Sequence, residues 1–215
     1  MLQLRPDLSF CFVGERAVML DLEADRYFLL EGDTLRAIRM ATTGDHEFEQ
    51  GMRLPTLGNR PMFVEGSAPV APIAATMPLR SALEAGAKRA RGFGVGELAV
   101  AQYRTHLSLR FRGLRSTIVR WRAARPTVPA RSDFDLALSL AQYYAAKRAL
   151  VPLRRSCVPD SLALMRMFWR HGLDADLLFG VRLDPFAAHC WVQSDDHLLS
   201  DPLSNIADFT PVFRL

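Results

Sequence analysis

Apolar and polar residues alternate along three short runs near the start of the chain. The runs cover residues 9–13, 17–22 and 26–30, and turn-forming residues separate them. A period of two between such turns is typical of half-buried β-strands. The pattern therefore predicts a three-stranded antiparallel meander.

The period becomes helical after residue 30. Leu35, Ile38 and Met40 follow helical spacing, and Asp33 or Thr34 can cap the helix that they predict. We expect a second helix over residues 45–52, and a short helix or a wing over residues 54–64.

A change of composition divides the chain. Residues 66–78 contain three prolines among alanine and serine, which neither a helix nor a central strand tolerates. We place the domain boundary there, with one domain at residues 1–74 and a second at residues 79–215. Residues 79–125 are predicted as a basic helical segment that glycines between residues 92 and 96 interrupt.

The charge of the 215-residue chain is uneven. The formal net charge is +4, but residues 80–131 hold twelve basic and two acidic side chains, and 12 − 2 = +10. Arginines at helical spacing are more often a solvated face, or a surface for an acidic protein or peptide, than a nucleic-acid site. We therefore expect no nucleic-acid partner.

Bulk features point to a soluble intracellular protein. Hydrophobic residues make up 49% of the chain, and no stretch has the length of a membrane span or the pattern of a signal peptide. The sequence thus predicts a cytoplasmic protein without membrane contacts. Cys11, Cys157 and Cys190 are odd in number and lack metal-ligand spacing, which favours a free thiol over a disulfide or a metal site.

Cys157 is the strongest candidate for chemistry. It precedes an apolar run at residues 161–169 that stops at His171 and Gly172, a pattern typical of a helix with a left-handed glycine after its last turn. An amphipathic helix at residues 133–150 is expected to pack behind it. Free amides and the positive end of the helix dipole favour a thiolate at such a helix start.

Strands predicted after this helix supply a base and an acid. Two runs, residues 175–181 and 187–193, read as adjacent strands, and a third run at residues 197–201 is expected to be antiparallel to the second. Alternation puts His189 on one face of its strand and Cys190 on the other. The third strand can bring Asp201 beside His189.

Cysteine, histidine and acid in this order match the nucleophile, base and orienting group of cysteine hydrolases and acyltransferases. A histidine in the middle of a strand is often only structural, so the constellation and not His189 alone carries this interpretation.

These residues also carry a resemblance. The stretches C-V-P-D-S-L-A-L-M-R, H-G-L-D-A-D-L-L-F-G-V-R-L-D-P-F-A-A-H-C-W-V and L-L-S-D resemble the transglutaminase-like leader peptidase of lasso-peptide biosynthesis, the B protein, over roughly residues 150–215. The resemblance implies an α+β chain that ends in a papain/transglutaminase-like cysteine protease domain. It also implies Cys157 as nucleophile, His189 as base and Asp201 as orienting acid.

The N-terminal part resembles a second known element. The residues A-V-M-L-D-L-E-A-D-R-Y-F-L-L-E-G-D-T-L-R-A-I resemble the winged-helix peptide recognition element of ribosomal peptide modification systems, which fused relatives of the B protein carry. This implies a winged-helix-like recognition domain that binds the leader of the precursor peptide as an added strand. We place the leader along the third strand, on Arg26, Tyr27, Phe28, Leu29 and Leu30. Tyr27 or Phe28 would form an apolar pocket wall, although Phe28 is more readily explained as core.

The implied function is hydrolysis of the leader from a lasso-peptide precursor. The partners implied are the precursor peptide and a separate lasso cyclase that uses ATP; the chain itself has no phosphate-binding loop and is expected to need no cofactor and no metal. Two alternatives remain open. One is acyl transfer to an amine by the same triad, and the other is a winged-helix DNA-binding regulator with a degenerate C-terminal domain.

Overall fold

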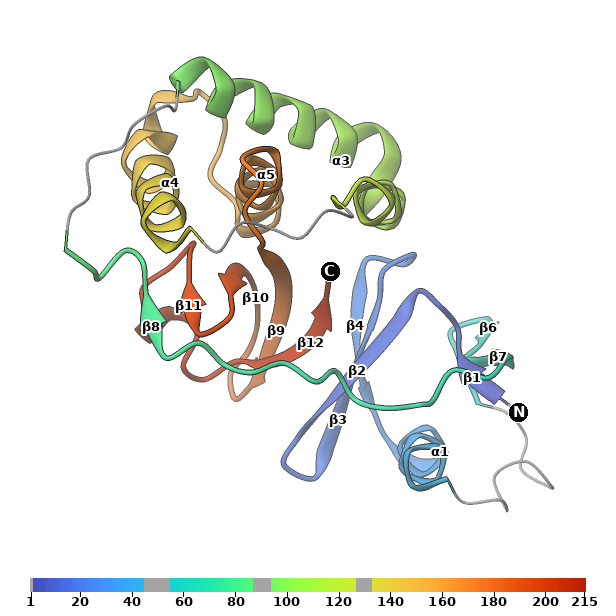
Figure 1. The fold of residues 1–215 in the computed structure, drawn as a ribbon. Coiled ribbons are helices and arrows are strands. Elements are labelled where there is room, and N and C mark those ends of the chain that lie inside the picture. The colour runs from blue at the N-terminus through green and yellow to red at the C-terminus, as the bar shows by residue number, and fades with distance from the viewer. Residues whose placement is uncertain (1, 45–54, 87–93, 127–132) are drawn as a thin grey trace.

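The computed structural model describes residues 2–44, 55–86, 94–126 and 133–215 (Figure 1). Within them lie a three-stranded and a five-stranded sheet, together with two small two-stranded sheets. Helices cover one side of each larger sheet, so the fold is a mixed α+β arrangement. The helix predicted over residues 45–52 lies outside the described residues.

The predicted meander is confirmed. Strands β2 (Leu8–Val13), β3 (Arg16–Asp21) and β4 (Arg26–Leu30) form an antiparallel sheet in the order β2-β3-β4. Helix α1 (Gly32–Thr43) follows, and its N-cap is Glu31, one turn earlier in the chain than a cap at Thr34 would require. The caps predicted at Asp33 or Thr34 were therefore wrong. Thr34 instead uses its hydroxyl to accept a bond from the Glu31 amide, which satisfies one donor at the helix start.

Alternation along these strands serves two different cores. Phe10, Met19 and Leu30 face α1 and belong to a local apolar cluster. Cys11 and Val18 point to the opposite face, where they join the large cluster that fills the C-terminal part of the chain. The N-terminal sheet is therefore buried on both faces, and β2 and β3 contact the last strand, β12.

Small strands complete the N-terminal part. Strand β1 (Leu2–Leu4) pairs antiparallel with β7 (Phe63–Glu65), and β5 (Thr56–Leu57) pairs with β6 (Arg60–Pro61). The piece at residues 54–64 thus contains short hairpin strands where it is described.

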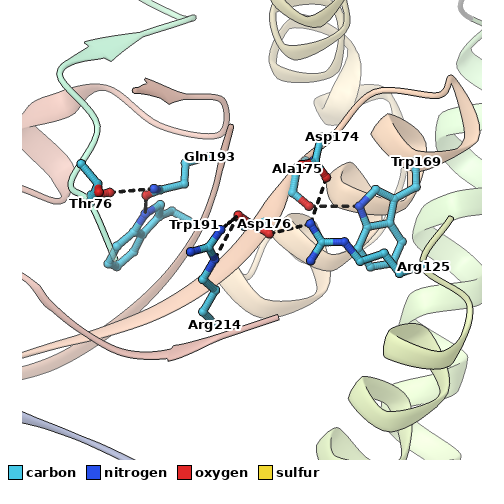
Figure 2. A network of polar contacts seen from close by, with 9 residues as sticks. All are labelled: Thr76, Arg125, Trp169, Asp174, Ala175, Asp176, Trp191, Gln193 and Arg214. Atoms are coloured by element: carbon cyan, nitrogen blue, oxygen red, sulfur yellow. Dashed lines mark hydrogen bonds and ion pairs between the residues drawn. The ribbon is translucent and has the colours of Figure 1, made fainter. Parts of the chain in front are cut away.

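The proline-rich segment at residues 66–78 is bound along its length. The Ile73 amide donates to the Phe10 carbonyl at 3.1 Å, and the Thr76 carbonyl accepts a bond from the Gln193 side chain at 2.8 Å (Figure 2). The chain then enters the second sheet as β8 (Arg80–Ser81), so the prediction that helix begins at residue 79 was wrong here. Residues 80–81 pair with β11 and do not form a helix, because backbone groups at a sheet edge need hydrogen-bond partners.

Three helices form one layer of the C-terminal part (Figure 1). They are α3 (Val95–Ala123), α4 (Phe134–Lys147) and α5 (Cys157–Arg170), with the short 3-10 turn η1 (Arg148–Leu150) after α4. Gly113 kinks α3 with φ 74° and ψ 176°, a conformation that only glycine adopts readily.

The second sheet has the order β12-β9-β10-β11-β8. Its strands are β9 (Asp176–Leu183), β10 (Phe186–Ser194), β11 (His197–Leu198) and β12 (Thr210–Arg214), and a 3-10 turn, η2 (Leu203–Asn205), precedes β12. The predicted hairpin of two strands is confirmed. The third strand is shorter than predicted, because it ends at Leu198 and not at residue 201.

Ion pairs fix the far end of this sheet against the helices. Arg125 and Arg214 both bind the Asp176 carboxylate, and Arg125 also binds Asp174 (Figure 2). Trp169 in α5 donates to the Ala175 carbonyl at 3.0 Å beside them. At least one arginine of the basic segment is therefore structural.

Candidate active site

Cys157 is the first residue of α5. Ser156 is the N-cap, with extended backbone angles, and the helix ends at His171 with Gly172 in the left-handed region, as predicted. The amides of Cys157 and Val158 lie in the first turn, so no helical carbonyl precedes them to accept their bonds, and Pro159 fits that turn because it has no amide hydrogen. Cys157 is partly buried, whereas Cys11 and Cys190 are fully buried; all three are free thiols.

A buried arginine holds the loop that leads to Cys157. Arg148 is 1% exposed, and its guanidinium binds Asp160 of α5 at 2.8 Å as well as the carbonyls of Val151 and Leu153. Tyr144 of α4 donates to the Asp160 carbonyl at 2.7 Å. These bonds couple α4, the loop and the first turn of α5, so they fix the direction in which Cys157 points.

His189 lies in the middle of β10, opposite Gly180 of β9. Its neighbour Cys190 lies in the core on the other face of the strand, as predicted, and burial raises the pKa of that thiol well above its usual range. Cys190 is thus inert at neutral pH.

Asp201 reaches His189 from beyond the end of β11. The Nε2 atom of His189 donates to Asp201 Oδ1 at 3.1 Å, and the Ser200 hydroxyl donates to Asp201 Oδ2 at 2.5 Å. Ser200 also accepts a bond from the Val192 amide, which replaces the next rung of the ladder after the strand ends. The predicted proximity of His189 and Asp201 is therefore confirmed, although a loop and not a strand supplies the acid.

The electrostatics of the site favour a charged histidine. A hydrogen bond with Asp201, followed by one with Cys157, raises the pKa of His189 to about 9. Burial alone would raise the pKa of the Asp201 carboxyl, but hydrogen bonds from His189 and Ser200 outweigh it and lower that pKa below its usual range. Since Nε2 binds Asp201, Nδ1 is the nitrogen left for Cys157.

Aromatic rings fix the plane of His189. Trp191 is stacked beside it with ring centroids 6.3 Å apart, and Phe209 lies 5.8 Å away. A Cβ atom on Gly180 would lie 2.4 Å from the Trp191 ring, so only glycine leaves room for this indole. The indole nitrogen is held by Gln193, which is itself tied to Thr76 (Figure 2).

The N-terminal sheet reaches the same site. Tyr27 of β4 packs against the large core together with Cys157, and its ring lies 6.0 Å from that of Phe186 at the start of β10. Burial raises the pKa of Tyr27, and electrostatic interaction with the nearby thiol groups of Cys190 and Cys157 raises it further. Phe28 packs into the local cluster around α1, as expected for a core residue.

The five residues predicted to bind a leader occupy the outer strand of their sheet. Among the described strands, β4 pairs only with β3, so its second edge has no strand partner there. Leu29 is 46% exposed, whereas Leu30 is buried.

Comparison with known proteins agrees with this geometry. A family model described as the transglutaminase-like superfamily matches residues 99–214, which include Cys157, His189 and Asp201. The chain belongs to the transglutaminase-like superfamily. That superfamily includes cysteine peptidases and acyltransferases. No curated protein and no solved structure matches the chain.

Sequence reasoning missed several supporting residues of this transglutaminase-like site. Ser200, Asn205 and Ser81 bind Asp201, and Phe209 packs on His189. Ser81 and Phe209 come from segments far from His189 in the sequence, so no local pattern could reveal them. Ser200 stands next to Asp201 and could have been suspected as its hydrogen-bond donor.

Among the described residues, no group of three His, Cys, Asp or Glu side chains is arranged to hold a metal ion. The helices that the structure describes include none long and apolar enough to cross a membrane.

Proposed function

We propose that this protein is a cysteine peptidase that removes the leader of a lasso-peptide precursor, with Cys157, His189 and Asp201 as its catalytic triad. The observation that carries the proposal is a free cysteine at a helix start whose histidine partner is held by Asp201 at 3.1 Å. The resemblance of the flanking residues to the lasso B protein supports the choice of substrate.

The chemistry follows the usual order for a thiol nucleophile. His189 takes the proton of Cys157, and the sulfur attacks the carbonyl carbon before the scissile bond. The resulting oxyanion accepts a hydrogen bond from the Cys157 amide. When the C–N bond breaks, the imidazolium of His189 gives its proton to the leaving amine, so the core peptide departs with a free N-terminus.

The leader is then held as a thioester on Cys157. His189 accepts a proton from water as the water attacks this thioester, and the C–S bond breaks to release the leader carboxylate. Asp201 keeps the imidazole oriented and stabilises its charged form in both steps. The freed amine of the core peptide would be the substrate of a separate ATP-dependent cyclase.

The open edge of β4 suits the leader. An extended peptide added there would gain main-chain hydrogen bonds from residues 26–30. Tyr27 belongs to this strand and lies within electrostatic reach of Cys157. A single extended substrate could therefore pair with β4 and continue past Tyr27 and Phe186 toward the nucleophile. In this proposal the N-terminal part is a winged-helix-like recognition domain.

The test is incubation of the full chain with the precursor peptide encoded beside it, followed by mass measurement of the products. Hydrolysis predicts two fragments whose masses sum to that of the precursor plus one water. A separate sample shows whether iodoacetamide alkylates Cys157. If it does, and unmodified wild-type protein still leaves the precursor intact, this substrate is ruled out while the thiol chemistry stays in place.

Acyl transfer to an amine is the second candidate, because the superfamily includes acyltransferases. Adding a primary amine to the same incubation distinguishes the two reactions. A leader fragment that carries the amine as an amide, in place of the free carboxylate, would favour transfer.

A further inference from the structure

The first half of α3 presents apolar side chains to solvent. Val100, Tyr103, Leu107 and Phe111 are 48%, 42%, 48% and 74% exposed. They are spaced by three, four and four residues, so at 100° per residue their directions fall within about 80°. We call these four residues the α3 stripe. The opposite side of the helix, with Leu98, Ala101 and Thr105, is buried.

The stripe has the dimensions of a helix-packing seam. It extends about 17 Å from Val100 to Phe111, at ~1.5 Å per residue, and it stops just before the kink at Gly113. Val100, Tyr103 and Leu107 have the three-then-four spacing of the apolar positions of a coiled coil, and Phe111 extends the stripe by one further turn. Among the described residues these side chains remain exposed, so nothing in that part of the chain covers them.

Arginines flank the stripe. At 100° per residue, Arg104 and Arg110 fall on opposite sides of Leu107. Arg104 is close enough to Arg166 of α5 to lower the pKa of that residue. We define an arginine cluster between α3 and α5 that consists of Arg104, Arg120, Arg166 and Arg170. Burial lowers the pKa of Arg166, and the charges of the other three arginines lower it further. Within the described chain only Arg170 of these four has a carboxylate nearby, at 3.7 Å from Glu97. Arg166 lies over the ring of Trp121, at 4.9 Å from its centroid.

Other arginines of the basic segment are used inside the molecule. Arg115 binds Asp7 at 2.5 Å, and Arg125 binds Asp174 and Asp176. The arginine cluster differs because the described chain places a carboxylate near only one of its four members, Arg170, so most of its charge is uncompensated there. Unpaired like charges next to exposed apolar side chains favour an acidic, amphipathic partner.

We propose that the α3 stripe and the arginine cluster form a docking surface for an amphipathic helix of a partner protein, with apolar residues on one face and acidic residues beside them. A second copy of this chain fits less well, because it would bring the same arginines opposite this cluster. Nucleic acid would satisfy the arginines but leave Val100 and Leu107 without apolar contacts. A membrane is less suitable because the apolar face is narrower than the face of ~100° or more that is usual for an amphipathic helix.

The experiment uses the full chain and a fluorescent synthetic peptide of about three heptads, with leucines at the seam positions and glutamates flanking them. Fluorescence anisotropy at physiological salt measures its dissociation constant. We expect saturable binding that weakens at least ~10-fold in the Leu107→Ser/Phe111→Ser double variant and also in Arg104→Glu, which correspond to losses of ~1.4 kcal/mol or more. All the changed side chains, including that of Arg104, are exposed on α3, and circular dichroism checks that each variant is folded.

Two matched controls separate this surface from general charge effects. Lys147→Glu changes the net charge as Arg104→Glu does, but on α4, and Val119→Ser removes an exposed apolar residue of α3 beyond the kink. Both should bind the peptide as the wild type does. Equal weakening by Lys147→Glu, or no saturable binding of the peptide by the wild type up to about 100 μM, would overturn the proposal.

Three further measurements exclude other occupants. If the protein sediments with phosphatidylserine-containing vesicles and the same variants abolish this, the surface binds a membrane. If the protein shifts duplex DNA in a gel and the same variants abolish this, the surface binds nucleic acid. Concentration-dependent dimerisation that Leu107→Ser/Phe111→Ser abolishes would assign it to a second copy. Each of these results would contradict the proposed helical partner.

Discussion

Asp201→Asn tests the link between the geometry of His189 and its charge. The substitution keeps the shape of the side chain but replaces the anionic acceptor 3.1 Å from Nε2 with a neutral amide. The pKa of His189 is raised from 6.5 to about 9, with Asp201 as the largest cause and Cys157 as the second. A rise in pKa of that size corresponds to at most ~3 kcal/mol in favour of the imidazolium, and solvent screening of the partly exposed ring makes the net contribution smaller.

We expect the pKa of His189, measured as its titration midpoint, to fall by roughly one to two pH units in Asp201→Asn. It does not return fully to 6.5, since the hydrogen bond with Cys157 supplies the rest of the rise. Turnover should fall by up to ~10⁴, the loss caused by neutralising the orienting acid of a Ser-His-Asp triad. In the wild type, activity should decline as pH rises through about 9, because the leaving amine then loses its proton donor. That decline should begin at lower pH in the variant.

The same group links pH to stability. The folded-state pKa of His189 is above its unfolded value. Its stabilising contribution to the free energy of unfolding is therefore complete below about pH 6.5 and is lost as pH rises through about 9. The difference in unfolding free energy between wild type and Asp201→Asn should therefore shrink over that interval. Urea unfolding at a series of pH values measures it.

NMR titration of labelled histidines gives the midpoint directly, and His189→Gln identifies the signal. Asp196→Asn is the control, because Asp196 lies 2.6 Å from His197 and not beside His189. It should leave the His189 midpoint and turnover unchanged. A His189 midpoint that remains near 9 in Asp201→Asn, or that moves in Asp196→Asn, would refute the assignment of Asp201.

Three more predictions concern the site. Cys157→Ala should abolish leader removal in a folded protein, whereas Cys190→Ala should keep most activity; mass analysis of precursor digests would contradict this if the order were reversed. Gly180→Ala should displace Trp191, lower stability by ~1–3 kcal/mol and reduce kcat more than it raises KM, as thermal melts and kinetics will tell. Tyr27→Pro removes an amide from the β4 edge and should weaken leader binding; anisotropy with labelled leader tests it, and unchanged affinity would place the leader elsewhere.

Local sequence determined the elements that carry the chemistry. Cys157 begins its helix because the residues around it are helix-start and helix-stop signals, and the alternation of β10 is enough to separate His189 from Cys190. The meander of the N-terminal sheet follows from its period of two in the same way. Such features depend on neighbours a few residues apart, so a single sequence contains the information.

Tertiary structure decided how those elements are joined. The proline-rich segment looks like a linker by composition, yet the bonds of Ile73 and Thr76 bind it to both parts of the chain. Val18 and Tyr27 belong to the same core as Cys157. The boundary between residues 74 and 79 remains a prediction, and a fragment that begins at residue 79 would expose apolar surface that the N-terminal sheet now covers.

The acid of the site shows the same limit. Asp201 was placed on a strand from its spacing, but β11 ends at Leu198 and Ser200 completes the pairing with β10 through its hydroxyl. Ser81 then holds the Asp201 backbone from a strand 120 residues earlier in the chain. A residue pattern specifies local conformation, whereas contacts between distant segments depend on packing that only the folded chain provides.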